Sequence, residues 1–84
     1  MMNPEQVKQI IEAGLPGAIA HVQGDDGVHF EAVVISASFA GQTPIKRHQV
    51  VFATLGNRMQ TNEIHALGLK TYTPEQWQTL NSTK

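Results

Sequence analysis

The sequence contains no cysteine, few aromatic residues and no excess of charge of either sign. Without thiols the chain cannot form a disulfide scaffold, a Cys-rich zinc finger, a thiol nucleophile or an iron–sulfur cluster held by its own thiolates. Six Lys and Arg residues against seven Asp and Glu residues leave a formal net charge of -1. This balance argues against the clearly basic surface that nucleic-acid-binding domains usually carry.

Long apolar segments are also missing. No apolar run is longer than that of residues 32–35, far below the roughly 20 residues that span a bilayer. The polar N-terminus shows no export signal, so we expect a cytoplasmic protein without membrane association. A length of 84 residues with 40% apolar side chains suits one small domain. We assign this domain to residues 1–80 and a polar tail to residues 81–84.

The spacing of apolar residues predicts three helices and one short helical turn. Asn3 is a suitable N-cap and Pro4 suits the first helical position, while Gly14 is a suitable helix end. Near the C-terminus, Thr73 is the expected N-cap, and Trp77 is expected to anchor the last helix on the sheet edge. The helices are expected at residues 4–13, at about 45–59 and from residue 74, with a turn or one-turn helix within 38–44.

Alternation and β-branched residues predict three strands, at residues 18–23, 28–36 and 64–72. A Gly-Asp-Asp-Gly turn joins the first two as a hairpin, whereas a helical crossover to the third permits a parallel pair. The order αββααβα predicts an α+β, two-layer sandwich in which helices cover one face of a three-stranded mixed sheet. This is the order of a type II KH-like module.

The KH-like order lacks the KH nucleotide clamp. A KH domain clamps the nucleic-acid backbone with a G-x-x-G loop between two helices. The sequence has G-x-x-G at residues 14–17, between the first helix and the first strand, where it serves as a helix end and turn. The loop at residues 39–44 lacks the motif. The sequence therefore predicts the fold without its clamp.

Enzyme motifs are absent as well. The histidines, at positions 21, 29, 48 and 65, do not form H-E-x-x-H, and no serine lies in G-x-S-x-G. Asp25 and Asp26 are neighbouring carboxylates, but turn composition explains both. We therefore do not expect an enzyme.

Two fragments of the sequence form a recognisable pattern. They are Phe39-x-Gly41-x-x-x-x-x-Arg47-His48-x-x-Val51, and Ile64-His65-Ala66-Leu67 followed by Thr71-Tyr72-Thr73-Pro74-Glu75-Gln76-Trp77. In this order and spacing they resemble the BolA family, and the resemblance covers nearly the whole chain. His29-Phe30 looks most like the IbaG branch of that family, whereas Arg47-His48 is closer to BolA proper.

The resemblance implies a non-enzymatic role. BolA-like proteins pair with monothiol glutaredoxins, share a 2Fe-2S cluster with them, and take part in iron–sulfur maturation, iron regulation and stress response. The family's C-terminal histidine, here His65, is a cluster ligand. In the family a second ligand comes from the loop and strand start before the Phe, where His29 is the only imidazole of this chain. Because the chain has no thiol, a glutaredoxin cysteine and glutathione would supply the remaining ligands.

His65 and His29 each also have a purely structural interpretation. His65 lies in line with Leu67 and Leu69, which is compatible with a partly buried core histidine, and His29 is compatible with an ordinary exposed strand residue. If the imidazoles bind iron, they must be neutral, so affinity should fall as the pH drops through the range where free histidine titrates.

Four cations remain to be interpreted: Lys46, Arg47, Arg58 and Lys70. Scattered solvated charges are one interpretation. A second is that Arg47, with Lys46 and Lys70, docks glutathione carboxylates or an acidic partner surface. A third is that Lys46, Arg47 and Arg58 contact DNA phosphates, which would make the chain a DNA-binding transcriptional or stress-response regulator with weak, salt-dependent affinity. The sequence leaves a homodimer open.

Overall fold

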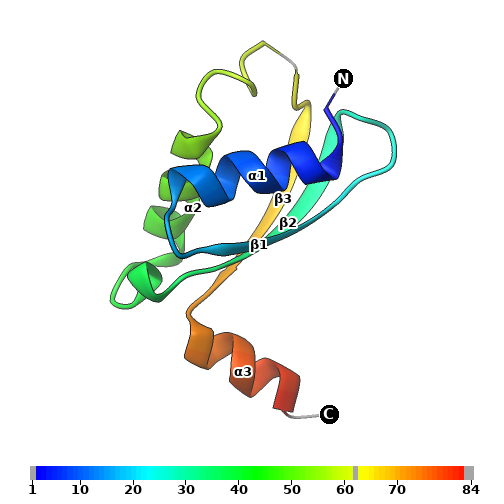
Figure 1. The fold of residues 1–84 in the computed structure, drawn as a ribbon. Coiled ribbons are helices and arrows are strands. Elements are labelled where there is room, and N and C mark those ends of the chain that lie inside the picture. Colours follow the sequence, from blue (N-terminus) through cyan, green and yellow to red (C-terminus); the bar gives the residue numbers. More distant parts are fainter. Residues whose placement is uncertain (1, 62, 83–84) are drawn as a thin grey trace.

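The computed structural model describes residues 2–61 and 63–82, and Figure 1 shows the arrangement of the elements. The elements are α1 (Pro4–Gly14), β1 (Ile19–Gln23), β2 (His29–Ile35), the 3-10 helix η1 (Ala37–Phe39), α2 (Pro44–Thr54), β3 (Ala66–Tyr72) and α3 (Pro74–Ser82). This order confirms the predicted α+β fold. Within the described residues, no helix combines the length and apolar character needed to cross a membrane.

The three strands form one mixed sheet in the order β1-β2-β3. β1 runs antiparallel to β2 and pairs Ile19 with Ile35, as expected for the hairpin. β2 runs parallel to β3 and pairs His29 with Ala66, as expected for the helical crossover. Because parallel strands start at the same end of a sheet, the first residues of β2 and β3 lie side by side.

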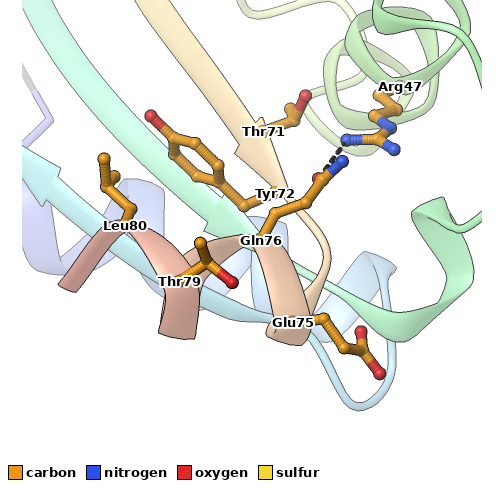
Figure 2. A pocket seen from close by; sticks show the side chains of 7 residues that line it. All are labelled: Arg47, Thr71, Tyr72, Glu75, Gln76, Thr79 and Leu80. Atoms are coloured by element: carbon orange, nitrogen blue, oxygen red, sulfur yellow. Dashed lines mark hydrogen bonds between the residues drawn. The ribbon is translucent and has the colours of Figure 1, made fainter. Parts of the chain in front are cut away.

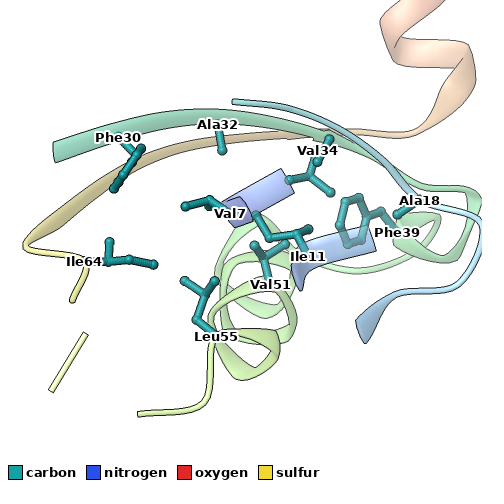
Figure 3. Packing of buried hydrophobic residues seen from close by; sticks show 11 residues of the cluster. Val7, Ile11, Ala18, Phe30, Ala32, Val34, Phe39, Val51, Leu55 and Ile64 are labelled. Carbon is teal, nitrogen blue, oxygen red and sulfur yellow. The ribbon is translucent and has the colours of Figure 1, made fainter. Parts of the chain in front are cut away.

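One face of the sheet packs against α1 and α2 (Figure 1). Alternate strand residues point into this space, and η1 contributes a fully buried phenylalanine between the two layers (Figure 3). The buried cluster comprises Val7, Ile11, Ala18, Ala20, Phe30, Ala32, Val34, Phe39, Val51, Leu55 and Ile64. Helices α1 and α2 therefore form one layer, and the sheet forms the other.

Two charged side chains of α1 bind the free edge of β1. Lys8 Nζ donates to Ala20 O over 3.1 Å, and Ala20 N donates to Glu12 Oε2 over 3.0 Å. Lys8 and Glu12 also form an ion pair at 2.7 Å. These contacts hold the pKa of Glu12 below its ordinary value, chiefly through the hydrogen bond from Lys8 and then that from the Ala20 backbone. The Lys8–Glu12 pair thus satisfies the backbone C=O and N–H of Ala20 at this edge, which would otherwise face water or pair with another strand.

Helix α2 ends earlier than predicted. The sequence indicated a helix to residue 59, but α2 ends at Thr54 and turns follow. Gly56 adopts a φ of 61°, which breaks right-handed helix geometry. Arg58 Nη1 then donates to Leu55 O over 3.0 Å and stabilises the turn.

Strand β3 also starts later than the predicted residue 64. Ile64 is fully buried in the core, and its backbone N donates to Arg58 O over 3.2 Å instead of pairing with β2. The apolar side chain anchors the connection between α2 and β3, so strand pairing begins only afterwards. Asn62, which precedes this connection, lies outside the described residues.

Helix α3 starts as predicted, with Thr73 as its N-cap. Gln76 N donates to Thr73 Oγ1 over 3.2 Å, and Thr73 N donates to Gln76 Oε1 over 2.9 Å, a reciprocal capping arrangement. The helix continues through Ser82 into the predicted tail. Residues 83 and 84 of that tail lie outside the described residues.

Helix α3 lies apart from α1 and α2, beyond the C-terminal end of β3 (Figure 1). Its Trp77 ring contacts Tyr72 at a centroid distance of 5.5 Å and His21 at 5.9 Å. By strand alternation, Tyr72 and His21 face away from the α1–α2 layer. Trp77 thus anchors α3 on the other face of the sheet through side chains of both edge strands, β1 and β3.

Candidate functional site

The structure brings His29 and His65 together at the end of the sheet where β2 and β3 begin. Their ring centroids lie 5.0 Å apart, with an angle of 58° between the planes. Val28 O accepts hydrogen bonds from His65 N at 2.7 Å and Ala66 N at 3.2 Å, which fixes the segment before β3 beside β2. Both histidines are exposed. The interpretation of His65 as a partly buried core residue is therefore wrong, because the chain turns at Ile64 and presents the next residue to solvent.

Asp26 holds the imidazole of His29. Its Oδ2 lies 2.6 Å from His29 Nδ1, while its Oδ1 accepts from Val28 N at 3.0 Å and from His29 N at 2.8 Å. These bonds lower the pKa of Asp26 from its ordinary value of 3.8 to about 2, with the backbone donor of His29 as the largest cause. Turn composition had explained this aspartate in the sequence. Its spacing of three residues from His29, across a glycine, is the signal that could have linked the two.

The centroid spacing of the two imidazoles matches the spacing of two ligands on one metal atom. Two imidazoles bound to one tetrahedral metal through bonds of about 2.1 Å have ring centroids roughly 5 Å apart, close to the spacing of His29 and His65. Two imidazoles can also replace two thiolates on one iron of a 2Fe-2S cluster. Among residues 2–61 and 63–82, no group of three or more His, Cys, Asp or Glu side chains is arranged to hold a metal ion.

Arg47 lies in the interior, where it joins three segments of the chain. It is 9% exposed. Its Nε donates to Gln42 O over 3.1 Å, its Nη1 donates to Gln76 Oε1 over 2.9 Å, and its guanidinium lies 5.7 Å from the centroid of the Phe39 ring. Figure 2 shows the bond to Gln76 at the groove between β3 and α3. Arg47 therefore supports the fold, and its docking role stays a prediction.

The other three cations lie at separate positions. Lys46 is exposed in the first turn of α2, whereas Arg58 follows the end of that helix. The 11 residues of α2 correspond to a length of about 16 Å. Lys70 is exposed on β3, on the sheet face away from α2. The structure thus distributes these charges rather than gathering them in one patch.

The two remaining histidines make contacts elsewhere. His21 stacks on Trp77 with an angle of 28° between the rings. His48 is half-buried on α2. Neither belongs to the His29–His65 pair, and His21 provides a matched control for experiments on that pair.

Comparison with known proteins identifies the family. Residues 6–76 match the family model described as BolA-like protein. The chain is 32% identical over 76 residues to the acid stress protein IbaG of Escherichia coli K12, which covers 90% of this chain and 89% of that protein. It is 38% identical over 78 residues to the DNA-binding transcriptional regulator BolA of Vibrio cholerae, over 93% of this chain and 69% of that protein.

A solved structure gives the same result. The structure of a bolA protein homologue from Coxiella burnetii superimposes with a TM-score of 0.84 at 47% identity, covering 93% of this chain and 99% of the other. The names of these relatives describe a stress protein and a regulator rather than enzymes. The resemblance inferred from the sequence is confirmed, and the chain belongs to the BolA-like family.

Proposed function

We propose that this chain is a non-enzymatic factor in iron–sulfur cluster assembly or trafficking, and that it shares a 2Fe-2S cluster with a monothiol glutaredoxin. The observation that carries the proposal is the exposed imidazole pair, His29 and His65, at a centroid distance of 5.0 Å. Exposure leaves both rings accessible to a cluster presented by another protein. The parallel β2–β3 pair supplies a rigid base for them.

The chemistry of the donors explains why a partner is needed. A 2Fe-2S cluster requires four protein or thiol ligands, and imidazoles can occupy two positions on one iron. With no cysteine, this chain contributes nitrogen alone. A glutaredoxin cysteine and the sulfur of glutathione would provide the thiolates on the other iron. Nitrogen donation requires neutral imidazoles, so the shared state should weaken in acid.

The test is to mix the purified chain anaerobically with cluster-loaded glutaredoxin and glutathione and to record visible circular dichroism. We expect a new spectrum for the wild-type mixture and its loss with His65→Ala or His29→Ala. His21→Ala should behave as the wild type, because its ring contacts Trp77. An unchanged mixed spectrum with His65→Ala would contradict the ligand assignment.

Lys70 is the cation best placed for docking this partner. It lies on the same sheet face as His29, the face away from α1 and α2, as the β2–β3 register and strand alternation require. Lys46 lies on α2, in the opposite layer. We expect Lys70→Ala to weaken glutaredoxin binding at low salt, as measured by isothermal titration, and Lys46→Ala to leave it unchanged. Equal effects of the two variants would count against this docking face.

A second candidate function is DNA binding, favoured by the name of the relative from Vibrio cholerae. Lys46 and Arg58 lie at separate positions and Arg47 is buried, so these three cations predict only weak, salt-dependent contacts with phosphates. A mobility-shift titration at physiological salt distinguishes the functions. Specific binding tighter than about 10⁻⁷ M, against roughly 10⁻⁴–10⁻⁶ M for non-specific binding, would support the regulator. Loss of this affinity in Lys46→Ala, but not in Lys8→Ala, would localise the contact.

A further inference from the structure

The Asp26 carboxylate makes three hydrogen bonds, two through Oδ1 and one through Oδ2. Oδ1 accepts from Val28 N and His29 N, so the backbone of the hairpin turn holds the carboxylate in place. Oδ2 lies 2.6 Å from His29 Nδ1. The backbone bonds explain why Asp26 suits the turn. The third contact is made to the imidazole of a proposed cluster ligand.

The contact between Asp26 Oδ2 and His29 Nδ1 determines which nitrogen carries the proton in neutral His29. An ionised carboxylate only accepts hydrogen bonds, so His29 Nδ1 must be the donor. In a neutral imidazole the other nitrogen, Nε2, then has its lone pair available. Carboxylates that orient metal-binding histidines act in the same way.

We propose that Asp26 is a positioning residue that fixes His29 in the Nδ1–H tautomer and leaves Nε2 as the nitrogen that binds iron. The ligand role of His29 in this inference rests on the proposed function. The tautomer rests on hydrogen-bond geometry alone. It assigns unequal roles to the two imidazoles. His29 is oriented before the partner arrives, whereas the His65 ring makes no hydrogen bond within residues 2–61 and 63–82.

The substitution Asp26→Asn tests whether Asp26 positions the imidazole of His29 or only stabilises the hairpin turn. The amide side chain introduced by this substitution keeps one oxygen for the two backbone donors, so the turn is preserved. It directs an amide N–H at His29 Nδ1, which can then serve only as an acceptor, and the proton moves to Nε2. Asp25→Asn is the matched control. Asp25 is an exposed neighbour, and its side chain makes no hydrogen bond within the described part of the chain.

The first readout is the tautomer in the protein without a cluster, from long-range ¹H–¹⁵N spectra at about pH 8, where free histidine is neutral. We expect Nδ1–H for His29 in the wild type and Asp25→Asn, and Nε2–H in Asp26→Asn. An Nε2–H tautomer in the wild type, or the same tautomer in all three, would overturn the inference. The wild-type spectrum decides the matter even if Asp26→Asn does not fold.

The second readout is formation of the mixed cluster with glutaredoxin. Loss of an orienting residue of this kind typically weakens metal binding about 10- to 100-fold, and we expect this for Asp26→Asn but not for Asp25→Asn. If the tautomer reverses but the cluster binds equally well, the positioning role is wrong. If the wild type forms no mixed cluster, the proposed function fails, while the NMR result still decides the tautomer.

Discussion

Arg47 and Gln76 join α2 to α3 through one partly buried hydrogen bond. Arg47 Nη1 donates to Gln76 Oε1 over 2.9 Å, and the same oxygen accepts from Thr73 N over 2.9 Å. The amide of Gln76 thus caps α3 and also receives the guanidinium (Figure 2). Because α3 lies apart from the main helical layer, this bond and the Trp77 contacts are central to its position.

Gln76→Ala should therefore destabilise the fold. The substitution removes the cap acceptor and leaves a buried Arg47 donor without its partner, at a cost of about 1–3 kcal/mol. Urea unfolding followed by circular dichroism would measure the difference. Gln78→Ala is the control, since it changes the same residue type at an exposed position of the same helix. Equal unfolding midpoints for the two variants would contradict the role of this bond.

Glu12→Ala should increase self-association. The Glu12 carboxylate accepts from Ala20 N at the free edge of β1, and its removal exposes a donor to which another strand can bind. Sedimentation velocity over a concentration series would detect the larger species. The control is Glu5→Ala, because Glu5 contacts Gln9 within α1 and does not reach β1. Matching sedimentation of the two variants would show that the Lys8–Glu12 pair does not protect this edge.

Acid should destabilise the protein partly through Asp26. Its pKa is about 2 in the folded chain against an ordinary value of 3.8. The ionised form therefore stabilises the fold above pH 3.8, and this contribution is lost as the pH falls toward 2. Urea midpoints measured over this range should fall less steeply for Asp26→Asn than for Asp25→Asn. Parallel curves would mean that the hydrogen bonds of Asp26 contribute nothing to folding.

Local sequence signals predicted most of the fold. The Asn3-Pro4 start of α1, the Gly-Asp-Asp-Gly turn and the alternation in β2 depend on neighbouring residues, so they can be read from one sequence. The end of α2 could not, because the apolar spacing continues past Gly56, where the backbone turns. The position of α3 depends on contacts of Trp77 with two strands, and spacing along the chain does not encode such contacts.

The candidate site was only partly predictable. The family resemblance indicated His29 and His65, but their proximity depends on parallel register and on the Val28 carbonyl. Asp26 was missed because a turn explained it. Arg47 was assigned to the surface because charged side chains are seldom buried. Its actual environment requires Phe39, Gln42 and Gln76 to converge from separate segments, and a linear pattern does not reveal that convergence.

The close packing of Gly24 against His29 yields a prediction about the site itself. A Cβ atom at Gly24 would lie 2.6 Å from His29 O and 2.7 Å from Phe30 Cδ1. The His29 carbonyl belongs to the backbone and cannot move alone, so Gly24→Ala should shift the start of β2 together with the imidazole. We expect changed amide resonances at the start of β2 and β3 and less mixed cluster with glutaredoxin.

Gly68→Ala is the control for this substitution. Its Cβ would lie 3.4 Å from Glu31 Oε1, the end of an exposed and flexible side chain that can move aside. The variant should keep the wild-type resonances of His29 and His65 and the wild-type yield of mixed cluster. If Gly24→Ala retains both as well, the position of His29 does not depend on the packing of the hairpin. The rigid placement of that imidazole would then have to come from the Asp26 bonds alone, which Asp26→Asn tests directly.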